Sequence, residues 1–123
     1  MIKGYFNNRG ELFFDIGLIA SDKSVKFEPA ILDTGFTDWL AMNIQDIESL
    51  DWAFIKTQKK YTANGLVRFN IYAGTVFFDN QEMTIPVIGG DEFTQVLMGL
   101  QWLNHRRLVV DREMDLLTLE KVL

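Results

Sequence analysis

Cysteine is absent from the 123-residue chain, and histidine occurs once, as His105. Without cysteine the chain has no disulfide framework, no thiolate nucleophile and no cysteine-bound zinc, and it does not depend on an oxidising compartment. A single histidine provides neither a serine–histidine pair nor a histidine-rich metal site. We therefore expect His105 to be a surface residue near a helix end rather than a ligand.

Long apolar runs are also missing. No stretch approaches the roughly 18 apolar residues of a membrane-spanning helix. The first ten residues, "MIKGYFNNRG", lack the apolar segment of a signal peptide. We therefore expect no membrane association and take a cytoplasmic location as the default.

Positive charge is scarce, because 17 acidic residues oppose 12 Lys and Arg and leave a formal net charge of −5. The basic residues form no stripe, so nucleic acid is not an expected partner. We expect the pair Arg106-Arg107 and the cluster of Lys56, Lys59 and Lys60 to be solvated surface.

The chain does have enough apolar residues for a core. It is 48% hydrophobic and 24% charged, and its length suits one globular domain spanning residues 1–123. Apolar and alternating runs predict strands over most of the chain. The strand-like runs lie at 2–7, 11–20, 25–32, 39–42, 52–61, 66–78, 82–88, 95–98 and 108–123.

Local signals predict the connections between these strands. Hairpin turns are expected at 7–10, at Asn64-Gly65, at 79–81 and at 112–115, with a loop at "GGDE", residues 89–92. Asn43 can cap a short helix over "IQDIESL", and a second short helix is expected after Gly99. The sequence therefore predicts a mostly β domain with one or two short helices.

The segment "AILDTG" ends an apolar strand with Asp33, Thr34 and Gly35. The strand would bring Asp33 to the edge of the core, and Gly35 would permit a tight turn whose backbone N–H groups can bind a carboxylate. A carboxylate held in this way can act as a general acid or base. The alternative is that Asp33 only stabilises the turn through an Asx-type hydrogen bond.

The order of motifs resembles that of the single-lobed, retropepsin-like aspartic proteases of clan AA. "VLMGLQWL" follows, with Gly99 66 positions after Asp33, and the Asn64-Gly65 hairpin lies between them. In that family the Asp-Thr-Gly motif carries the catalytic aspartate, a hairpin flap covers the substrate, and a hydrophobic-hydrophobic-Gly motif lies behind the catalytic loop. The last role would fall on Leu97, Met98 and Gly99.

The similarity extends over nearly the whole chain and is closest to small bacterial members of the clan, through "DTGF", "LMGLQWL" and "RLVVD". Two positions depart from their pattern. Asp38 stands where those relatives commonly have Gly, and Met98 replaces the Leu of a Leu-Gly-Met-like motif. Because of Asp38, the substrate pocket and specificity of those relatives cannot be carried over to this chain.

The resemblance implies a closed β-barrel of the acid-protease fold and an aspartic endopeptidase that needs no metal or organic cofactor. With one Asp-Thr-Gly per chain, it implies a homodimer acting on a peptide or protein substrate, with the terminal segments "MIKGYF" and "LLTLEKVL" interleaved between subunits. The implied catalytic residues are Asp33, Thr34 and Gly35. The implied substrate-binding residues are Phe36, Asp38, Tyr61, Ala63, Asn64 and Gly65.

Several roles stay open at this stage. The Thr34 hydroxyl would bond across the two-fold axis or locally at the strand end, and Phe36 would line the site or belong to the core. Asp38 would face substrate or solvent. We expect Trp39, Trp52 and Trp102 to be core and interface aromatics rather than a ligand cage.

Two other classes of protein remain possible from the sequence. One is a catalytically silent dimer of the same fold that binds extended peptides by strand addition. The other is a small monomeric β-barrel in which the Asp-Thr-Gly motif is coincidental.

Overall fold

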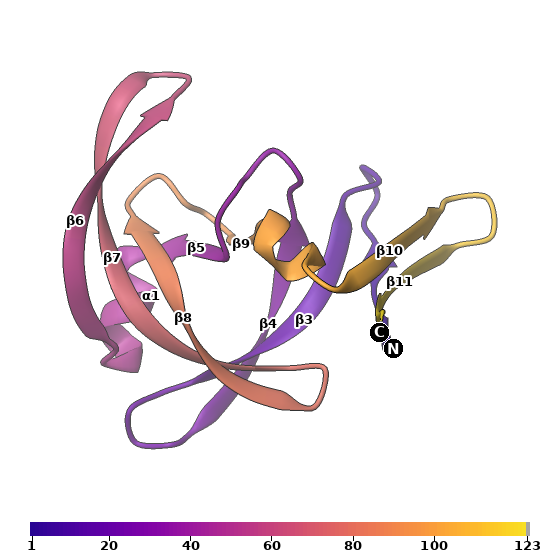
Figure 1. The fold of residues 1–123 in the computed structure, drawn as a ribbon, viewed down its shortest axis with the longest axis horizontal. Coiled ribbons are helices and arrows are strands. Elements are labelled where there is room, and N and C mark those ends of the chain that lie inside the picture. The colour runs from indigo at the N-terminus through magenta and orange to yellow at the C-terminus, as the bar shows by residue number, and fades with distance from the viewer. Residues whose placement is uncertain (123) are drawn as a thin grey trace.

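Strands dominate the computed structural model, which describes residues 1–122 (Figure 1). The first seven strands are β1 (Ile2–Lys3), β2 (Tyr5–Phe6), β3 (Leu12–Ile19), β4 (Val25–Leu32), β5 (Leu40–Asn43), β6 (Ala53–Thr62) and β7 (Gly65–Phe78). The others are β8 (Gln81–Gly90), β9 (Val96–Met98), β10 (Arg106–Asp111) and β11 (Leu116–Lys121). The helices are α1 (Ile44–Leu50) and the 3₁₀ helix η1 (Leu100–Leu103).

Six of these strands close into a barrel. In the eight-stranded sheet, β3 pairs with β4, and the order continues through β9, β5, β8 and β7. The last of these returns to β3, with Gly17 opposite Phe77. The pairs β4–β9 and β5–β8 are parallel, and the other pairs in the ring are antiparallel. The prediction of a mostly β, closed barrel with short helices is confirmed.

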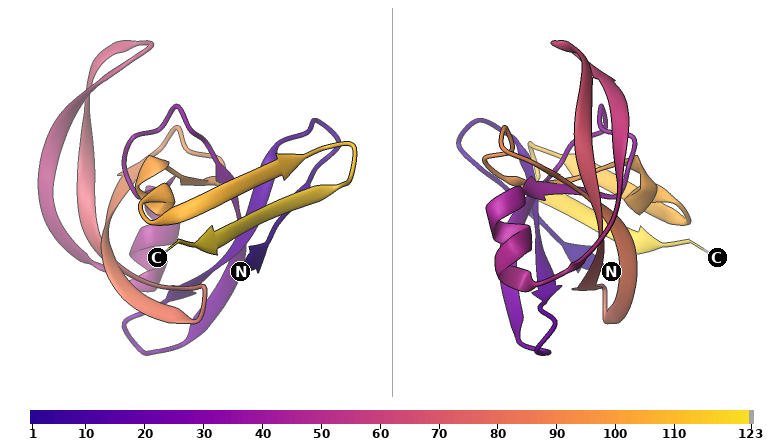
Figure 2. Two further views of the ribbon diagram at one scale, coloured as in Figure 1. Left: turned by 45° about the vertical axis from the view of Figure 1, so that its right-hand side comes forward. Right: turned by 90° about the vertical axis from the view of Figure 1, so that its left-hand side faces the viewer.

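The hairpin of β6 and β7 extends beyond this ring. β6 is the last strand of the sheet and pairs only with β7. Pairing of β7 with β8 begins at Asn70, so residues 65–69 of β7 have only β6 as a neighbour. We call residues 57–69 the arm, and Figures 1 and 2 show it rising past the rest of the barrel.

Aromatic side chains fill the barrel interior. Phe78 packs edge-on against Phe14 and Trp102, with ring centroids 6.3 and 5.0 Å apart. Each of these three side chains is at most 2% exposed. Trp39 packs against Trp102, and the Trp52 indole donates to the Ile19 carbonyl inside the core. Trp52 and Trp102 are therefore core aromatics, as expected, and Trp39 is partly buried against the same core.

A smaller apolar cluster lies at the base of the arm. Its buried members are Ala41, Phe69, Ile71 and Ile88, and Phe36, Val67, Phe93 and Leu97 pack against them. The segments that meet here come from the centre of the sheet and from two loops. This cluster therefore joins the arm to the barrel.

The chain ends form a separate three-stranded sheet of β1, β11 and β10. β1 pairs with β11 of the same chain, with Ile2 opposite Leu119, so these two strands lie side by side (Figure 1). The two ends thus already pair within one chain, and β11 has a neighbour on each side. Within residues 1–122, the outer edges of β1 and β10 have no partner strand in this sheet. Leu123, the end of the predicted last hairpin, lies outside the described residues.

The predicted turns are in place, but two differ in detail. At the tip of the arm, Thr62 pairs with Gly65, so Ala63 and Asn64 form the turn and only Gly65, with φ +94°, is left-handed. The type I′ pattern, with both central φ values positive, occurs instead at Asp79 and Asn80. The arm therefore turns through two residues, and its positive φ falls on the glycine that follows the turn.

The predicted loop at 89–92 begins later than expected, because β8 continues through Gly90. A Cβ on Gly89 would lie 3.0 Å from both the Ile47 side chain and the Tyr72 ring. Gly89 thus permits α1 to pack closely on the sheet rather than marking a turn. α1 itself has the predicted cap, because the Asn43 side chain accepts from the Gln45 N–H at 2.9 Å.

The prediction of a solvated Arg106 is wrong. The Arg106 side chain is only 8% exposed and its guanidinium lies over the rings of Phe78 and Trp102, so it belongs to the packed interior. Arg107 is exposed and pairs with Glu120, and His105 is exposed just after η1, both as predicted. No helix within residues 1–122 is long and apolar enough to cross a membrane.

Candidate active site

Asp33 follows the last residue of β4 and is fixed to the neighbouring strand. Its backbone N–H donates to the Met98 carbonyl at 2.9 Å, which continues the β4–β9 pairing. The Asp33 side chain is exposed, and its Oδ1 accepts from the Gly35 N–H at 2.9 Å. The expected backbone bond to the carboxylate is therefore present, and it is also the bond of an Asx turn.

Gly35 was predicted to permit a tight turn, but its role beside the Asp33 carboxylate is to leave space. Its φ does not lie in the left-handed region, so the turn itself does not require glycine. A Cβ at this position would lie 3.2 Å from Asp33 Oδ1, which is tighter than ordinary van der Waals contact. The absence of a side chain leaves room for the carboxylate beside the turn.

Gly99 and η1 support the Asp33 loop from behind. The Gly99 N–H donates to the Trp39 carbonyl at 3.0 Å, and the Leu100 N–H donates to the Phe36 carbonyl at 2.8 Å. A Cβ on Gly99 would lie 2.0 Å from the Asp38 carbonyl oxygen, so any side chain here would collide with the loop backbone. Gly99 therefore lies behind the Asp33 loop, in the position that the family resemblance implied.

Side chains of η1 complete this support. The Gln101 amide donates to the Thr37 carbonyl at 3.1 Å, and the Trp102 indole donates to the Trp39 carbonyl at 2.7 Å. Because Trp102 is fully buried, the second bond ties the end of the Asp33 loop to the barrel core. The loop is therefore held through its backbone, and the Asp33 carboxylate is left facing solvent.

A cleft of about 580 Å³ opens between this loop and the arm. Of the predicted site residues, Gly35, Phe36, Asp38, Tyr61 and Asn64 line it. Ala63 and Gly65 are exposed at the tip of the arm but are not lining residues, and Asp33 and Thr34 lie next to the lining Gly35. The cleft thus brings the two predicted groups of residues, 33–38 and 61–65, to one side of the molecule.

The apolar lining of the cleft was missed in the sequence. It consists of Val67, Phe69, Ile88, Phe93 and Leu97 together with Phe36. Alternation along β7 points Val67 and Phe69 to the same face, and that signal was present in "LVRFNIY". The others come from β8, β9 and the loop before it, and only the closed fold brings them together.

Asp38 forms an ion pair with the arm. Lys60 Nζ lies 2.7 Å from Asp38 Oδ2, and the two side chains are 25% and 39% exposed. The prediction of a solvated Lys60 is therefore wrong, while Lys56 and Lys59 are exposed as expected. The Asp38 carboxylate faces the cleft, where it pairs with the Lys60 ammonium group of the same chain and is also in contact with solvent.

Thr34 and Phe36 lie on either side of Gly35. Thr34 is exposed, and within residues 1–122 its hydroxyl makes no hydrogen bond. The local strand-end bond considered for Thr34 is therefore absent from this part of the chain. Phe36 both lines the cleft and packs on the cluster of Phe69 and Ile88, so its two expected roles coexist.

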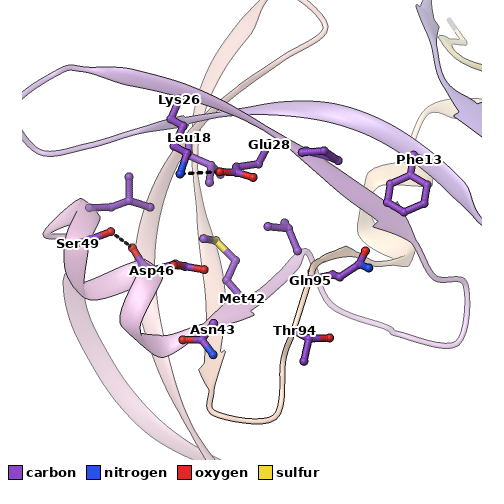
Figure 3. Close-up of a pocket in the computed structure, with 13 residues that line it drawn as sticks. Phe13, Leu18, Lys26, Glu28, Met42, Asn43, Asp46, Ser49, Thr94 and Gln95 are labelled. Carbon is purple, nitrogen blue, oxygen red and sulfur yellow. Dashed lines mark hydrogen bonds and ion pairs between the residues drawn. The ribbon is translucent and has the colours of Figure 1, made fainter. Parts of the chain in front are cut away.

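A second hollow of about 340 Å³ lies between β4 and α1 (Figure 3). It shares no lining residue with the cleft, and no residue of the Asp-Thr-Gly motif reaches it. Lys26 Nζ lies 2.8 Å from Glu28, whose carboxylate raises the pKa of Lys26, and Asp46 is the other charged side chain in the lining. No group of three or more candidate metal ligands occurs in the described part of the chain.

The barrel, the supported aspartate loop and the arm together define the fold of the retropepsin-like aspartic proteases. A retropepsin-like aspartic protease from Rickettsia conorii superimposes with a TM-score of 0.71 at 22% identity, over 96% of this chain and 88% of that one. The resemblance seen in the sequence is thus confirmed at the level of the fold.

Two viral proteases are also similar in structure. The simian foamy virus (mac) protease has a TM-score of 0.53 at 17% identity, over 74% of this chain and 93% of that one. The EIAV protease, in complex with the inhibitor HBY-793, has a TM-score of 0.58 at 13% identity, over 80% of this chain and 89% of that one. No protein-family model and no curated protein sequence matches the chain.

Proposed function

We propose that this chain is an aspartic endopeptidase in which Asp33 carries the chemistry. The observation that supports this most directly is the exposed Asp33 carboxylate, held by the Gly35 N–H beside a cleft with an apolar floor. The structural neighbours are described as proteases, and the inhibitor complex shows that one of them accepts a ligand. The whole of residues 1–123 would form one protease domain.

The proposed unit is a homodimer, because each chain has a single Asp-Thr-Gly and hydrolysis of a peptide bond by carboxylates needs two. Two chains related by a two-fold axis would place their Asp33 side chains together. Thr34, exposed beside Asp33, would bond to the other copy. The open edges of β1 and β10 are available for pairing between the subunits.

The two carboxylates would share one proton, since two adjacent negative charges repel each other. The ionised Asp33 takes a proton from water as the water oxygen attacks the scissile carbonyl carbon. The protonated Asp33 donates its proton to the carbonyl oxygen. When the C–N bond then breaks, the leaving nitrogen takes a proton from the carboxyl group that was protonated by the water. One hydroxyl of the tetrahedral carbon gives its proton to the other carboxylate, so the pair again holds one proton and the reaction consumes only water.

A second candidate is a silent dimer that binds extended peptides without cutting them. The cleft supports it independently of Asp33, because its lining depends on the arm and the apolar cluster. In either case we propose a peptide or protein as the ligand. A cytoplasmic location suits a chain without cysteine.

The deciding experiment is incubation of the protein with a peptide library from acidic to neutral pH, comparing the parent with Asp33→Asn. Asparagine keeps an oxygen that can accept from the Gly35 N–H, so the fold should persist while cleavage is abolished. Asp46→Asn, which removes an exposed carboxylate on α1, is the matched control and should cleave as the parent does. Undiminished turnover by Asp33→Asn would contradict the proposal, and retained binding without any cleavage by the parent would favour the silent dimer.

A further inference from the structure

Charge is divided unevenly along this acidic chain. Residues 52–78 contain four basic side chains, Lys56, Lys59, Lys60 and Arg68, and no Asp or Glu. All 17 acidic residues and only eight of the 12 Lys and Arg lie elsewhere, so the arm and its base are positive while the rest of the chain is negative. Fields of this kind attract ligands of the opposite sign.

The positive charges gather on the arm. Lys59 lies directly opposite Arg68 across the β6–β7 ladder, and Lys60 is the next residue along β6. Like charges in opposite positions destabilise a strand pair. Within residues 1–122 neither Lys59 nor Arg68 has an ion-pair partner, and Lys60 has only Asp38. The repulsion between Lys59 and Arg68 therefore destabilises the arm, and an anionic ligand bound between them would reduce that repulsion.

The positions of these cations relate them to the cleft. Lys59 and Lys60 both border it. Lys60, opposite Val67, is on the face of the hairpin that carries the apolar lining, and Lys59, opposite Arg68, is on the other face at the rim. The outer edge of β6 has no partner strand in the described part of the chain, so an extended backbone could pair with it. A ligand that satisfies all of these groups is extended, with an apolar side chain beside acidic ones.

We propose that the arm recruits extended peptide segments in which acidic residues flank an apolar residue. The acidic side chains bind Lys59 and Lys60, and the apolar side chain enters the floor of the cleft. This rests on the proposed function and deepens it, because it names the substrate class. A nucleic acid would satisfy the charges but not the apolar floor.

Asp38 has an opposing role in this scheme. Its 2.7 Å ion pair with Lys60 must be broken before an acidic peptide can use that cation. Asp38 therefore acts as an internal competitor that sets how acidic a ligand must be to bind. Removal of its charge frees Lys60 and should strengthen binding, while removal of the lysines should weaken it.

The test measures binding in the Asp33→Asn background, so that cleavage does not consume the peptide. Labelled decapeptides share one apolar centre and carry Glu, Gln or Lys on both flanks, and their affinities are measured by fluorescence anisotropy. The Glu peptide should bind best. Lys59→Gln and Lys60→Gln should each weaken it by about two- to five-fold, as expected for one partly exposed ion pair. Asp38→Asn should strengthen it by a similar factor.

Two controls separate these effects from general changes in charge. Lys23→Gln removes one positive charge at the β3–β4 turn, far from the arm in Figure 1, and should leave all affinities unchanged. The preference for Glu over Gln should also shrink as salt rises toward about 1 M, where the screening length falls to about 3 Å. A preference that persists at high salt would contradict an electrostatic origin.

Equal affinity for the Glu and Gln peptides would overturn the proposal. So would a single-stranded oligonucleotide of equal charge that displaces the Glu peptide more effectively than unlabelled peptide does. If the Glu peptide binds through Lys59 and Lys60 but the parent never cleaves it, recruitment stands and the protease function fails. If the parent cleaves peptides without regard to flanking charge, the protease function stands and recruitment fails.

Discussion

Gly99 lies where the support of the Asp33 loop is tightest. The carbonyl oxygens of Asp38 and Phe36 lie 2.0 and 2.7 Å from the position that a Cβ on Gly99 would occupy. Both are backbone atoms, so no side-chain rotation can relieve the contact. A side chain at position 99 can therefore be accommodated only if the backbone of the Asp33 loop moves.

Gly99→Ala should lower the free energy of unfolding by about 1–3 kcal/mol, the usual cost of overpacking, and should reduce cleavage because the Asp33 loop is displaced. Urea unfolding measures the first effect and peptide turnover the second. Gly65→Ala is the comparison, since a Cβ there meets no atom within 4 Å and tests only the strain of φ +94°. Equal stability of Gly99→Ala and the parent would contradict the support described here.

Single residues differ in how far the sequence could specify them. Asp33 and Gly99 were identified because each belongs to a short motif whose members are neighbours in the chain. Lys60 was misjudged because its partner Asp38 is 22 positions away and meets it only when the arm folds over the loop. Gly35 was identified as important, but for turn geometry rather than for the space that its missing Cβ leaves beside the carboxylate.

At the scale of elements, the arm is the part of the sheet with the least support. Residues 65–69 of β7 pair only with β6, whereas β9 lies between β4 and β5. Backbone hydrogen bonds that depend on one exposed hairpin open more readily than those inside a barrel. The arm should therefore move on a microsecond to millisecond scale while the barrel stays closed.

Amide hydrogen exchange should show residues 60–68 exchanging well before 96–98. Gly65→Val should distort the tip, because a β-branched residue resists φ +94°, and should impair turnover more than it lowers the melting temperature. Comparable protection of the two segments would argue against a mobile arm. A large fall in melting temperature for Gly65→Val would show that the tip supports the barrel.

Local elements were largely predictable and their closure was not. The hairpins and α1 follow from turn residues and from the cap at Asn43, which act over a few positions. The parallel pairs β4–β9 and β5–β8, and the β3–β7 contact that closes the ring, join segments with no local signal. Their register depends on the shared core, so only the resemblance to a known family indicated a barrel in advance.

For the whole molecule, the question is how two chains would build one site. A single chain exposes one Asp33 carboxylate at the edge of its cleft, and its own terminal strands already pair with each other. Subunits that associate through the edges of β1 or β10 would exchange without unfolding the barrel. Mixtures of different subunits should therefore reach random pairing.

Equal amounts of parent and Asp33→Asn chains should form one parent dimer in every four, although half of the chains are parent. If the site needs both carboxylates, activity should fall to about a quarter of that of the same total amount of parent protein. Turnover of a peptide substrate after equilibration is the measurement, and Asp46→Asn in place of Asp33→Asn is the control that should leave activity unchanged. A value near one half would show that each chain acts alone.

Beyond its apolar base the arm has no strand pairing with the barrel within residues 1–122, so it can rotate about that base as a lever does. Five residues, 65–69, separate the tip from the last pairing with the barrel. At about 3.3 Å per residue this is roughly 16 Å, so a rotation of about 10° at the base displaces the tip by about 3 Å. Lys60, opposite Val67, lies partway along the lever, and its 2.7 Å contact with Asp38 would break with a small rotation. The ion pair between Lys60 and Asp38 therefore holds the arm to the Asp33 loop, and a small rotation at the base of the arm breaks it.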